Sequence, residues 1–409
     1  MAGEYQNLAV FNFNHHDPEL LESEYQARLN GYATTLTGMM PTLMDVKNGA
    51  TQRRYPIFYI QTAQINLLLE RMRSLARKIS RLVNSLPALA NTQYRNKLII
   101  DEIYNTNKIE NVNTDIAEIG TTLESVQMDT SRGRFYSTVT MYMKMTEGYK
   151  PQIDRLQDIR DLYDDVIANE IDDDLLPDGE LFRSKFVRIG TDTKTYHVPP
   201  TSESEINNQL EQWMAFINGH DIDYVPKALI AHFMFENTHP FYDGNGRIGR
   251  FMLSSYLAAK LDTLTGLTVS TGISENQAKY YKAFQTAGDG RNRADLTLFV
   301  RDMLEIIIDG QLRALEFLTE ASEQFDQLLE QANRIAGEDE VAFAVMSALI
   351  QSKLFVEEQR FGIKDAELIE LVGNQFNNHS RVKQTLQRLE DDGVITLVSR
   401  RPKQHIINL

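Results

Sequence analysis

The segment HPFYDGNGRIGR, residues 239–250, lies between two helical patterns. The upstream pattern begins near Pro226, which the first turn of a helix tolerates, and it must stop at Pro240. Downstream, apolar residues from Ile248 onward recur at helical spacing. The segment is therefore expected to be a glycine-rich loop that joins two helices.

This loop has the composition of an anion site. Gly244 and Gly246 carry no Cβ, so successive backbone N–H groups can converge on an anion at the start of the second helix. Arg247 and Arg250 lie one helical turn apart, and their planar guanidinium groups suit bidentate contacts with phosphate. The loop is predicted to hold a polyphosphate.

Two further side chains of the loop suggest phosphate-transfer chemistry. Asp243 offers a hard oxygen ligand for Mg²⁺, which takes one or two carboxylates together with substrate phosphates. His239 is a base with a pKa near neutrality, able to accept a proton from an attacking hydroxyl. The glycine spacing also matches the dinucleotide fingerprint, but that fingerprint requires a preceding strand, and a helical pattern precedes here. A zinc site of His232, Glu236 and His239 is disfavoured because the spacing differs from HExxH.

Composition narrows the class of protein. The chain has 409 residues, 42% of them hydrophobic, a net charge of −15 and no cysteine. Thiolate metal sites, disulfides and cysteine nucleophiles are thereby excluded. The first residues lack the pattern of a secretory signal and no stretch is apolar enough to span a membrane, so we expect a cytoplasmic protein that does not bind membranes. The acidic balance argues against non-specific nucleic-acid binding by the whole molecule.

Helical periodicity dominates the chain and predicts a mainly α protein. The predicted helical segments are 65–83, 98–127, 135–148, 152–168, 204–218, 226–236, 248–261, 277–286, 295–308 and 310–335. Alternating residues at 185–189 and 195–198, around a turn at Gly190, predict a β-hairpin over 185–198. The acidic stretch 161–174 is interpreted as a solvated face.

The last part of the chain has a different pattern. Three short helices at 341–352, 364–372 and 378–391 precede two strand-like runs at 394–399 and 405–408, the order of a winged helix. Six basic residues fall on its last helix and wing turn: Arg381, Lys383, Arg388, Arg400, Arg401 and Lys403. They could contact DNA phosphates. Winged helices also bind proteins, and Glu390 would repel phosphate, so both functions stay open.

The segment 239–250 resembles the signature of the Fic family, HPFx[D/E]GNGRxxR, with every specified position matched. The resemblance implies a Fic-type helical bundle with a β-hairpin flap, and transfer of AMP from ATP to a hydroxyl side chain of a target protein or of the enzyme itself. It implies that His239 is the base, Asp243 the Mg²⁺ ligand, and Phe186, Val187, Arg188 and Ile189 of the flap the target-binding edge. The residues that it assigns to nucleotide binding are Gly244, Asn245, Gly246, Arg247, Arg250, Asn276, Tyr280 and Tyr281.

A second motif lies far upstream. Thr106, Glu110 and Asn111 fit the family's inhibitory pattern [S/T]xxxE[G/N], and a separation of four residues places Thr106 and Glu110 on one helix face. In relatives with this motif the glutamate pairs with the second motif arginine, which here is Arg250, and blocks the γ-phosphate. The resemblance thus implies an autoinhibited protein adenylyltransferase.

Three parts of the chain are expected: residues 1–175 with an inhibitory helix near 104–112, a catalytic core at 176–336, and a winged-helix domain at 340–409. Two other functions stay open: a DNA-binding regulator whose Fic core senses nucleotide, and a bifunctional enzyme that also removes AMP. Another nucleotide could replace ATP as donor, and a homodimer is plausible for the family. A Doc-like kinase is disfavoured because those relatives lack the second arginine.

Overall fold

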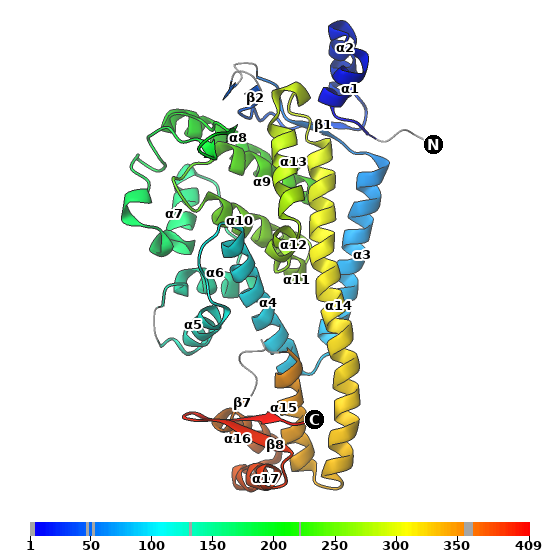
Figure 1. Ribbon diagram of the computed structural model, residues 1–409, viewed down its shortest axis with the longest axis vertical. Coiled ribbons are helices and arrows are strands. Elements are labelled where there is room, and N and C mark those ends of the chain that lie inside the picture. Colours follow the sequence, from blue (N-terminus) through cyan, green and yellow to red (C-terminus); the bar gives the residue numbers. More distant parts are fainter. Residues whose placement is uncertain (1–4, 46–48, 51–53, 131–132, 221, 356–362) are drawn as a thin grey trace. The chain divides into compact units, whose positions relative to one another are not determined.

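The computed structural model describes residues 5–45, 49–50, 54–130, 133–220, 222–355 and 363–409 (Figure 1). It is mainly helical, which confirms the predicted class. Two compact units are present, one of Met1–Ala76 with Asp101–Gln311 and one of Arg77–Ile100 with Leu312–Leu409. The three-part division expected above stays a prediction. Among the described residues, no helix has the length and apolar character needed to cross a membrane.

The helices and strands follow one another in a fixed order along the chain. Up to the hairpin they are α1 (Leu8–His15), α2 (Pro18–Leu29), β1 (Thr34–Leu36), β2 (Met44–Asp45), β3 (Gly49–Ala50), β4 (Phe58–Ile60), α3 (Ala63–Ser85), α4 (Ala88–Ile109), α5 (Ile116–Met128), α6 (Tyr136–Thr146), α7 (Leu156–Val166), β5 (Ile189–Gly190) and β6 (Thr195–His197). After it come α8 (Glu203–Asn218), α9 (Tyr224–Thr238), α10 (Asn245–Lys260), α11 (Thr263–Gly266), α12 (Val269–Glu275), α13 (Gln277–Gly288), α14 (Thr297–Ala336), α15 (Glu340–Phe355), β7 (Ile363–Lys364), α16 (Asp365–Phe376), α17 (His379–Asp391), β8 (Ile395–Arg400) and β9 (Lys403–Ile407).

Helix α9 is the centre of the first unit. The Asp223 side chain accepts from the Val225 N–H and caps its start, and Pro226 lies in its first turn. Nearly every residue of α9 is buried, and α8 and α10 pack against it. Trp213 of α8 donates its indole N–H to the Ala231 carbonyl at 2.8 Å, which fixes α8 on α9. The predicted helix pair around 239–250 is therefore built into the core.

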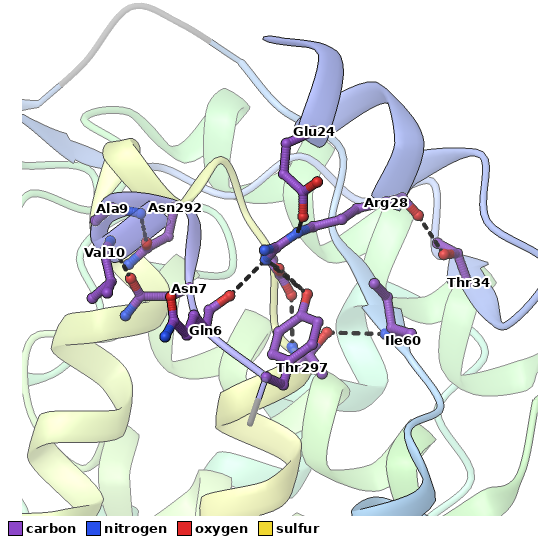
Figure 2. A network of polar contacts seen from close by, with 12 residues as sticks. Gln6, Asn7, Ala9, Val10, Glu24, Arg28, Thr34, Ile60, Asn292 and Thr297 are labelled. Carbon is purple, nitrogen blue, oxygen red and sulfur yellow. Dashed lines mark hydrogen bonds and ion pairs between the residues drawn. The ribbon is translucent and has the colours of Figure 1, made fainter. Parts of the chain in front are cut away.

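The N-terminal residues are tied to the start of α14. Arg28 of α2 donates to the Gln6 carbonyl at 2.7 Å and to Asp295 at 3.3 Å (Figure 2). The Ala9 N–H of α1 donates to Asn292 at 2.9 Å. Because Arg28 joins segments far apart in the sequence, it holds α1 and α2 on the helical core.

One predicted helix is two. The pattern over 98–127 breaks between α4 and α5, where Asn111 adopts a left-handed φ of 57° and Asp115 caps α5 by accepting from the Ala117 N–H. Apolar periodicity continues across this corner, so periodicity alone does not reveal it.

Two predicted helices are one. Segments 295–308 and 310–335 form the single 40-residue helix α14. Gly310 lies inside this helix and does not end it. A Cβ at this position would lie 2.4 Å from the Thr268 carbonyl oxygen, so the glycine is needed for close packing. The glycine permits close approach of α12 rather than a turn.

The C-terminal part of the second unit contains the predicted elements. Helices α15, α16 and α17 pack with a three-stranded antiparallel sheet of order β7-β9-β8. Strand β7 was not predicted. The core includes Val345, Leu349, Val382, Leu386 and Ile395. The order of elements agrees with the expectation, and the winged-helix assignment stays a prediction.

Candidate active site

The loop between α9 and α10 is shaped by its own residues. His239 ends α9 in a left-handed conformation, with φ 50°, and Gly244 precedes α10 with φ 82°. The Asn245 side chain accepts from the Phe241 N–H at 2.9 Å and donates to the Phe241 carbonyl at 2.8 Å. Both ends of its amide are therefore used to close the loop, and Asn245 acts here as a positioning residue.

The His239 ring is half-buried and uncharged at neutral pH. Burial, together with the neighbouring His197 and Arg183, lowers its pKa to about 3. Its Nδ1 has no hydrogen-bond partner among the described residues. The near-neutral pKa expected from the sequence therefore does not hold in the folded chain, because the ring is buried. The ring is neutral and its Nδ1 is uncommitted, so it can still accept a proton.

Arg183 fixes the loop to the base of the flap, a role that sequence patterns do not reveal. Its guanidinium donates to the carbonyls of His239 at 2.8 Å, Lys185 at 2.9 Å and Pro200 at 2.8 Å. The side chain is fully buried, and burial lowers its pKa to about 10. No carboxylate pairs with it among the described residues. Arg183 therefore joins the segments on both sides of the hairpin to the loop 239–250.

Arg247 is held by a carboxylate that we interpreted as part of a solvated face. Glu170 lies 3.1 Å from Arg247 Nη1, and the two side chains are 1% and 3% exposed. Thr138 donates a hydrogen bond to the same carboxylate. Burial raises the pKa of Glu170. The interpretation of 161–174 is therefore wrong at Glu170, although Asp161, Asp165 and 172–174 are exposed.

Arg250 meets the two residues of the upstream motif. Its Nε donates to Thr106 Oγ1 at 2.8 Å, and its Nη2 donates to the Thr106 carbonyl at 3.1 Å and to Glu110 Oε1 at 2.7 Å. Arg250 is 1% exposed. The structure thus brings α4 and α10 together at the residues that the motif predicts (Figure 1).

Gly246 provides the space for Glu110. A Cβ at Gly246 would lie 2.0 Å from Glu110 Oε1 and 2.9 Å from Arg250 Nη1. The Glu110 carboxylate therefore rests against the first turn of α10, the position at which a helix attracts an anion.

The contact between α4 and α10 extends one turn further, to a residue outside the motif. Glu102 accepts from Ser254 Oγ at 3.0 Å and from the Ser270 N–H at 2.8 Å. Burial raises the pKa of this carboxyl to about 7. Glu102, Thr106 and Glu110 are four residues apart and share one helix face, so the spacing itself is a signal that could have identified Glu102.

Asn111 explains the Gly or Asn of the upstream pattern. Its φ of 57° is a conformation that favours glycine and tolerates asparagine. The Val112 N–H then returns to the Asn107 carbonyl at 2.9 Å. This turn ends α4 at Ile109, directly before Glu110.

The residues predicted for the nucleotide base lie on or before α13. Tyr280 is buried, and its hydroxyl shares a 2.9 Å hydrogen bond with His232 Nε2. Tyr281 donates to the Ile109 carbonyl at 3.2 Å, so it contacts the end of α4. Asn276 donates to the Gly272 carbonyl at 3.0 Å. All three are held by hydrogen bonds, and Tyr281 lies at the end of α4, where Ile109 is next to Glu110 in the sequence.

Glu236 is a further carboxyl under the loop. Its Oε1 has no hydrogen-bond partner among the described residues and would lie 2.1 Å from a Cβ at Gly249. Burial raises its pKa to about 8, whereas the charge of Arg250 opposes that rise. Gly249, the third glycine of the segment 239–250, therefore leaves room for a buried carboxyl.

Asp243 has the exposure that a metal ligand needs. Its side chain is 48% exposed, its Oδ1 accepts from the Gly244 N–H at 2.6 Å, and its Oδ2 lies 3.7 Å from Arg247. Among the described residues no group of three or more His, Asp and Glu side chains could hold a metal ion. A single carboxylate still fits Mg²⁺, which takes few protein ligands when phosphates and water supply the rest.

The flap hairpin is shorter than predicted. Only Ile189–Gly190 pairs with β6, and the register shifts between these two residues. Residues 185–188 are not strand, because the Lys185 backbone is bound by Arg183 and by the Tyr242 hydroxyl. Phe186 is 58% exposed and Arg188 is exposed, while Val187 and Ile189 are half-buried.

Three of the six C-terminal cations are already in ion pairs. Arg381 and Arg388 lie 3.3 and 2.7 Å from Asp339, and Lys403 lies 3.5 Å from Glu390. These contacts neutralise part of the surface proposed for DNA, and that proposal stays untested.

Comparisons relate part of the chain to known proteins. Residues 152–257 match the model of the Fic/DOC family. The chain is 33% identical over 96 residues to a probable protein adenylyltransferase of Aquifex aeolicus, covering 22% of this chain and 26% of that protein. It is 28% identical over 180 residues to protein adenylyltransferase Fic of Aedes aegypti, covering 44% of this chain and 33% of the relative. A crystal structure of a Fic family protein from Desulfovibrio desulfuricans G20 is 19% identical, with a TM-score of 0.49, and 86% of this chain and 97% of that chain are covered.

These matches confirm the resemblance within limits. The chain spans about a quarter to a third of the length of these two curated relatives. The family match contains the whole loop 239–250 and ends before the residues predicted for the nucleotide base. Thr106 and Glu110 lie outside it.

Proposed function

We propose, from the premise that residues 152–257 are a Fic/DOC family domain, that this chain is a protein adenylyltransferase that transfers AMP from ATP to a protein hydroxyl and is held inactive by Glu110. The observation that carries the proposal is the Glu110 carboxylate bound to Arg250 and resting against Gly246. A carboxylate there takes the place of an anion at the start of α10.

The reaction requires little covalent chemistry from the protein. The oxygen of the target hydroxyl forms a bond to the α-phosphorus of ATP, and the bond from that phosphorus to the bridging oxygen breaks, releasing pyrophosphate. His239 accepts the hydroxyl proton. The backbone of Gly244 and Gly246 and the side chain of Arg247 supply positive charge to the phosphates.

Mg²⁺ and ATP are part of this proposal. The exposed carboxylate of Asp243 would hold the metal, beside the loop that holds the phosphates. The ion would neutralise negative charge on the phosphates. CMP, UMP or GMP transfer differs only at the base pocket, for which we propose Asn276, Tyr280 and Tyr281.

Inhibition follows from competition for Arg250. The guanidinium is fully buried and already binds Thr106 and Glu110, so a γ-phosphate must displace Glu110 to reach it. ATP then binds without its terminal phosphate in place, and the α-phosphate is misaligned for attack.

Target choice rests on the flap and on the C-terminal segment. We propose that residues 186–189, which lead into β5, bind an extended target peptide by strand addition. Self-modification, a homodimer, a cytoplasmic location and DNA binding through the C-terminal segment stay predictions from the sequence.

Mass spectrometry of the intact protein tests the proposal. Wild type, Glu110→Gly, Lys108→Gly and the double variant Glu110→Gly/His239→Ala are incubated with Mg²⁺ and ATP. Lys108→Gly is the matched control, because it places a glycine on the exposed side of the same helical turn without touching Arg250. We expect an added AMP mass in Glu110→Gly alone.

The other outcomes separate the alternatives. Equal labelling of wild type and Glu110→Gly would contradict inhibition. Absence of labelling with ATP, CTP, UTP and GTP would leave a nucleotide sensor, provided that nucleotide binding is detected. Offering AMP-modified protein tests AMP removal, which requires that Glu110→Ala abolish the release.

A further inference from the structure

A cavity of about 320 Å³ lies in the first unit, and of the segment 239–250 only Gly249 lines it. Its walls come from α8, α9, α10 and the segment 150–153. Neither Arg247 nor Arg250 lines it. Its volume is at the lower end of the range for small-molecule sites, roughly 300–1,000 Å³.

The inner part of the cavity is apolar. Trp213, Phe235, Met252 and Leu253 line it and are buried. Ala228 of α9 faces the cavity as well, and its small side chain leaves space among these large ones. An apolar body would be removed from water there, at a gain of roughly 25 cal/mol per Å².

The mouth of the cavity is cationic in a chain that is acidic overall. Lys150 and Lys260 line it and are exposed. Asp223 is the one carboxylate among the described lining residues, and it is held by an ion pair with Arg73. A ligand with an anionic end would therefore complement the mouth.

The floor holds a polar atom without a partner. His232 lines the cavity and its side chain is fully buried. Its Nε2 is bonded to Tyr280, while Nδ1 makes no hydrogen bond among the described residues and lies 4.0 Å from Glu236 Oε1, which makes none either. Such a buried group calls for an explanation, and a ligand atom at the floor supplies one.

We propose that this cavity binds a small amphipathic carboxylate, with its apolar body between Trp213 and Phe235 and its carboxylate between Lys150 and Lys260. The site is distinct from the phosphate loop and does not depend on the function proposed for that loop. His232 at the floor bonds a polar atom of the inner end when the ligand has one.

A matched pair of probes tests the charge requirement. Binding of 4-phenylbutyrate and of its neutral amide to the full chain is measured by calorimetry and by thermal shift. We expect the carboxylate to bind and to raise the melting temperature, and the amide to bind at least about fivefold more weakly, as loss of two exposed charge contacts implies. Equal affinity of the two probes would overturn the proposal, as would binding of neither.

Two variants locate the site. Lys150→Gln/Lys260→Gln is expected to weaken carboxylate binding about fivefold, and Lys383→Gln in the C-terminal segment is the matched control with no effect. Ala228→Phe fills the cavity and should abolish binding of both probes. Binding unchanged in the two cavity variants would overturn the location. Because AMP transfer is not the readout, failure here is distinguishable from failure of the proposed function.

Discussion

Two pairs of arginines behave differently in this molecule. Arg247 and Arg250 on α10 are 3% and 1% exposed, and each binds a carboxylate that lies more than 70 residues away in the sequence. Arg381 and Arg388 on α17 are 55% and 51% exposed and share Asp339. The pairs have similar distances, so burial is the difference between them.

Burial decides what each ion pair does. A buried guanidinium without its carboxylate costs several kcal/mol, because the charge stays out of water. An exposed pair contributes roughly 0–1 kcal/mol and is screened by salt. The α10 arginines are therefore held in place by their partners until a phosphate replaces them, whereas the α17 arginines can exchange partners at little cost.

The largest expected effect is on AMP transfer and comes from Asp243, an exposed residue of the loop whose loss should hardly change stability. Asp243→Ala, made in the Glu110→Gly background, should lower Mg²⁺-dependent AMP transfer at least about a hundredfold. Its side chain is half-exposed, so the free energy of unfolding should change by no more than about 0.5 kcal/mol. Labelling rates measure the transfer, and thermal unfolding measures the change in stability. Retained transfer would mean that the metal ligand lies elsewhere.

Glu170→Gln tests the buried ion pair between Arg247 and Glu170. The variant keeps the shape of the side chain but leaves Arg247 without its full counter-charge, so we expect a loss of about 3 kcal/mol in the free energy of unfolding. Calorimetry measures it. A loss below about 1 kcal/mol would show that the nearby Asp243 compensates, and the contrast with α17 would then fail.

A third prediction concerns the pH dependence of stability. Burial raises the pKa of Glu236 to about 8, against an ordinary value of 4.5, so the folded state keeps its proton where the unfolded state loses it. Stability from this group is full below pH 4.5 and declines as the pH rises toward 8. Glu236→Gln should flatten that decline in melting temperature. Curves that stay parallel would contradict the raised pKa.

Asp339→Asn should have the smallest effect. Both of its partners are exposed, so we expect a change of about 0.2–1 kcal/mol that shrinks as salt is added. Thermal unfolding at low and high salt measures it, beside Glu170→Gln, whose effect should persist in salt. An effect as large as that of Glu170→Gln would remove the distinction between the two pairs.

The sequence reveals the parts of the site whose signals are local. The helix–loop–helix at 239–250 follows from Pro240, the glycines and the periodicity on either side. The meeting of Arg250 with Thr106 and Glu110 follows from a motif, since a spacing of four places both residues on one face.

The parts that sequence reasoning missed depend on partners far along the chain. Glu170 lies 77 residues from Arg247, and Arg183 lies 56 residues from His239. No periodicity separates Glu170 from the exposed carboxylates around it, because its burial is a property of the folded unit. The flap was predicted too long for a related reason. The backbone carbonyl and N–H of Lys185 are hydrogen-bonded to Arg183 and Tyr242, so they are not available for strand pairing.

Arg183 has a kinetic consequence. Its guanidinium is bound by carbonyl oxygens alone, which leave its full positive charge uncancelled next to the catalytic loop. Around it the chain carries a net charge of −15 and would repel a polyanion at a distance. Local positive charge raises the rate of encounter with a nucleotide, and salt shortens its range to about 10 Å at 0.1 M. Under the proposed function, the association rate of ATP should therefore fall as ionic strength rises, and Arg183 contributes to that dependence together with Arg247 and Arg250.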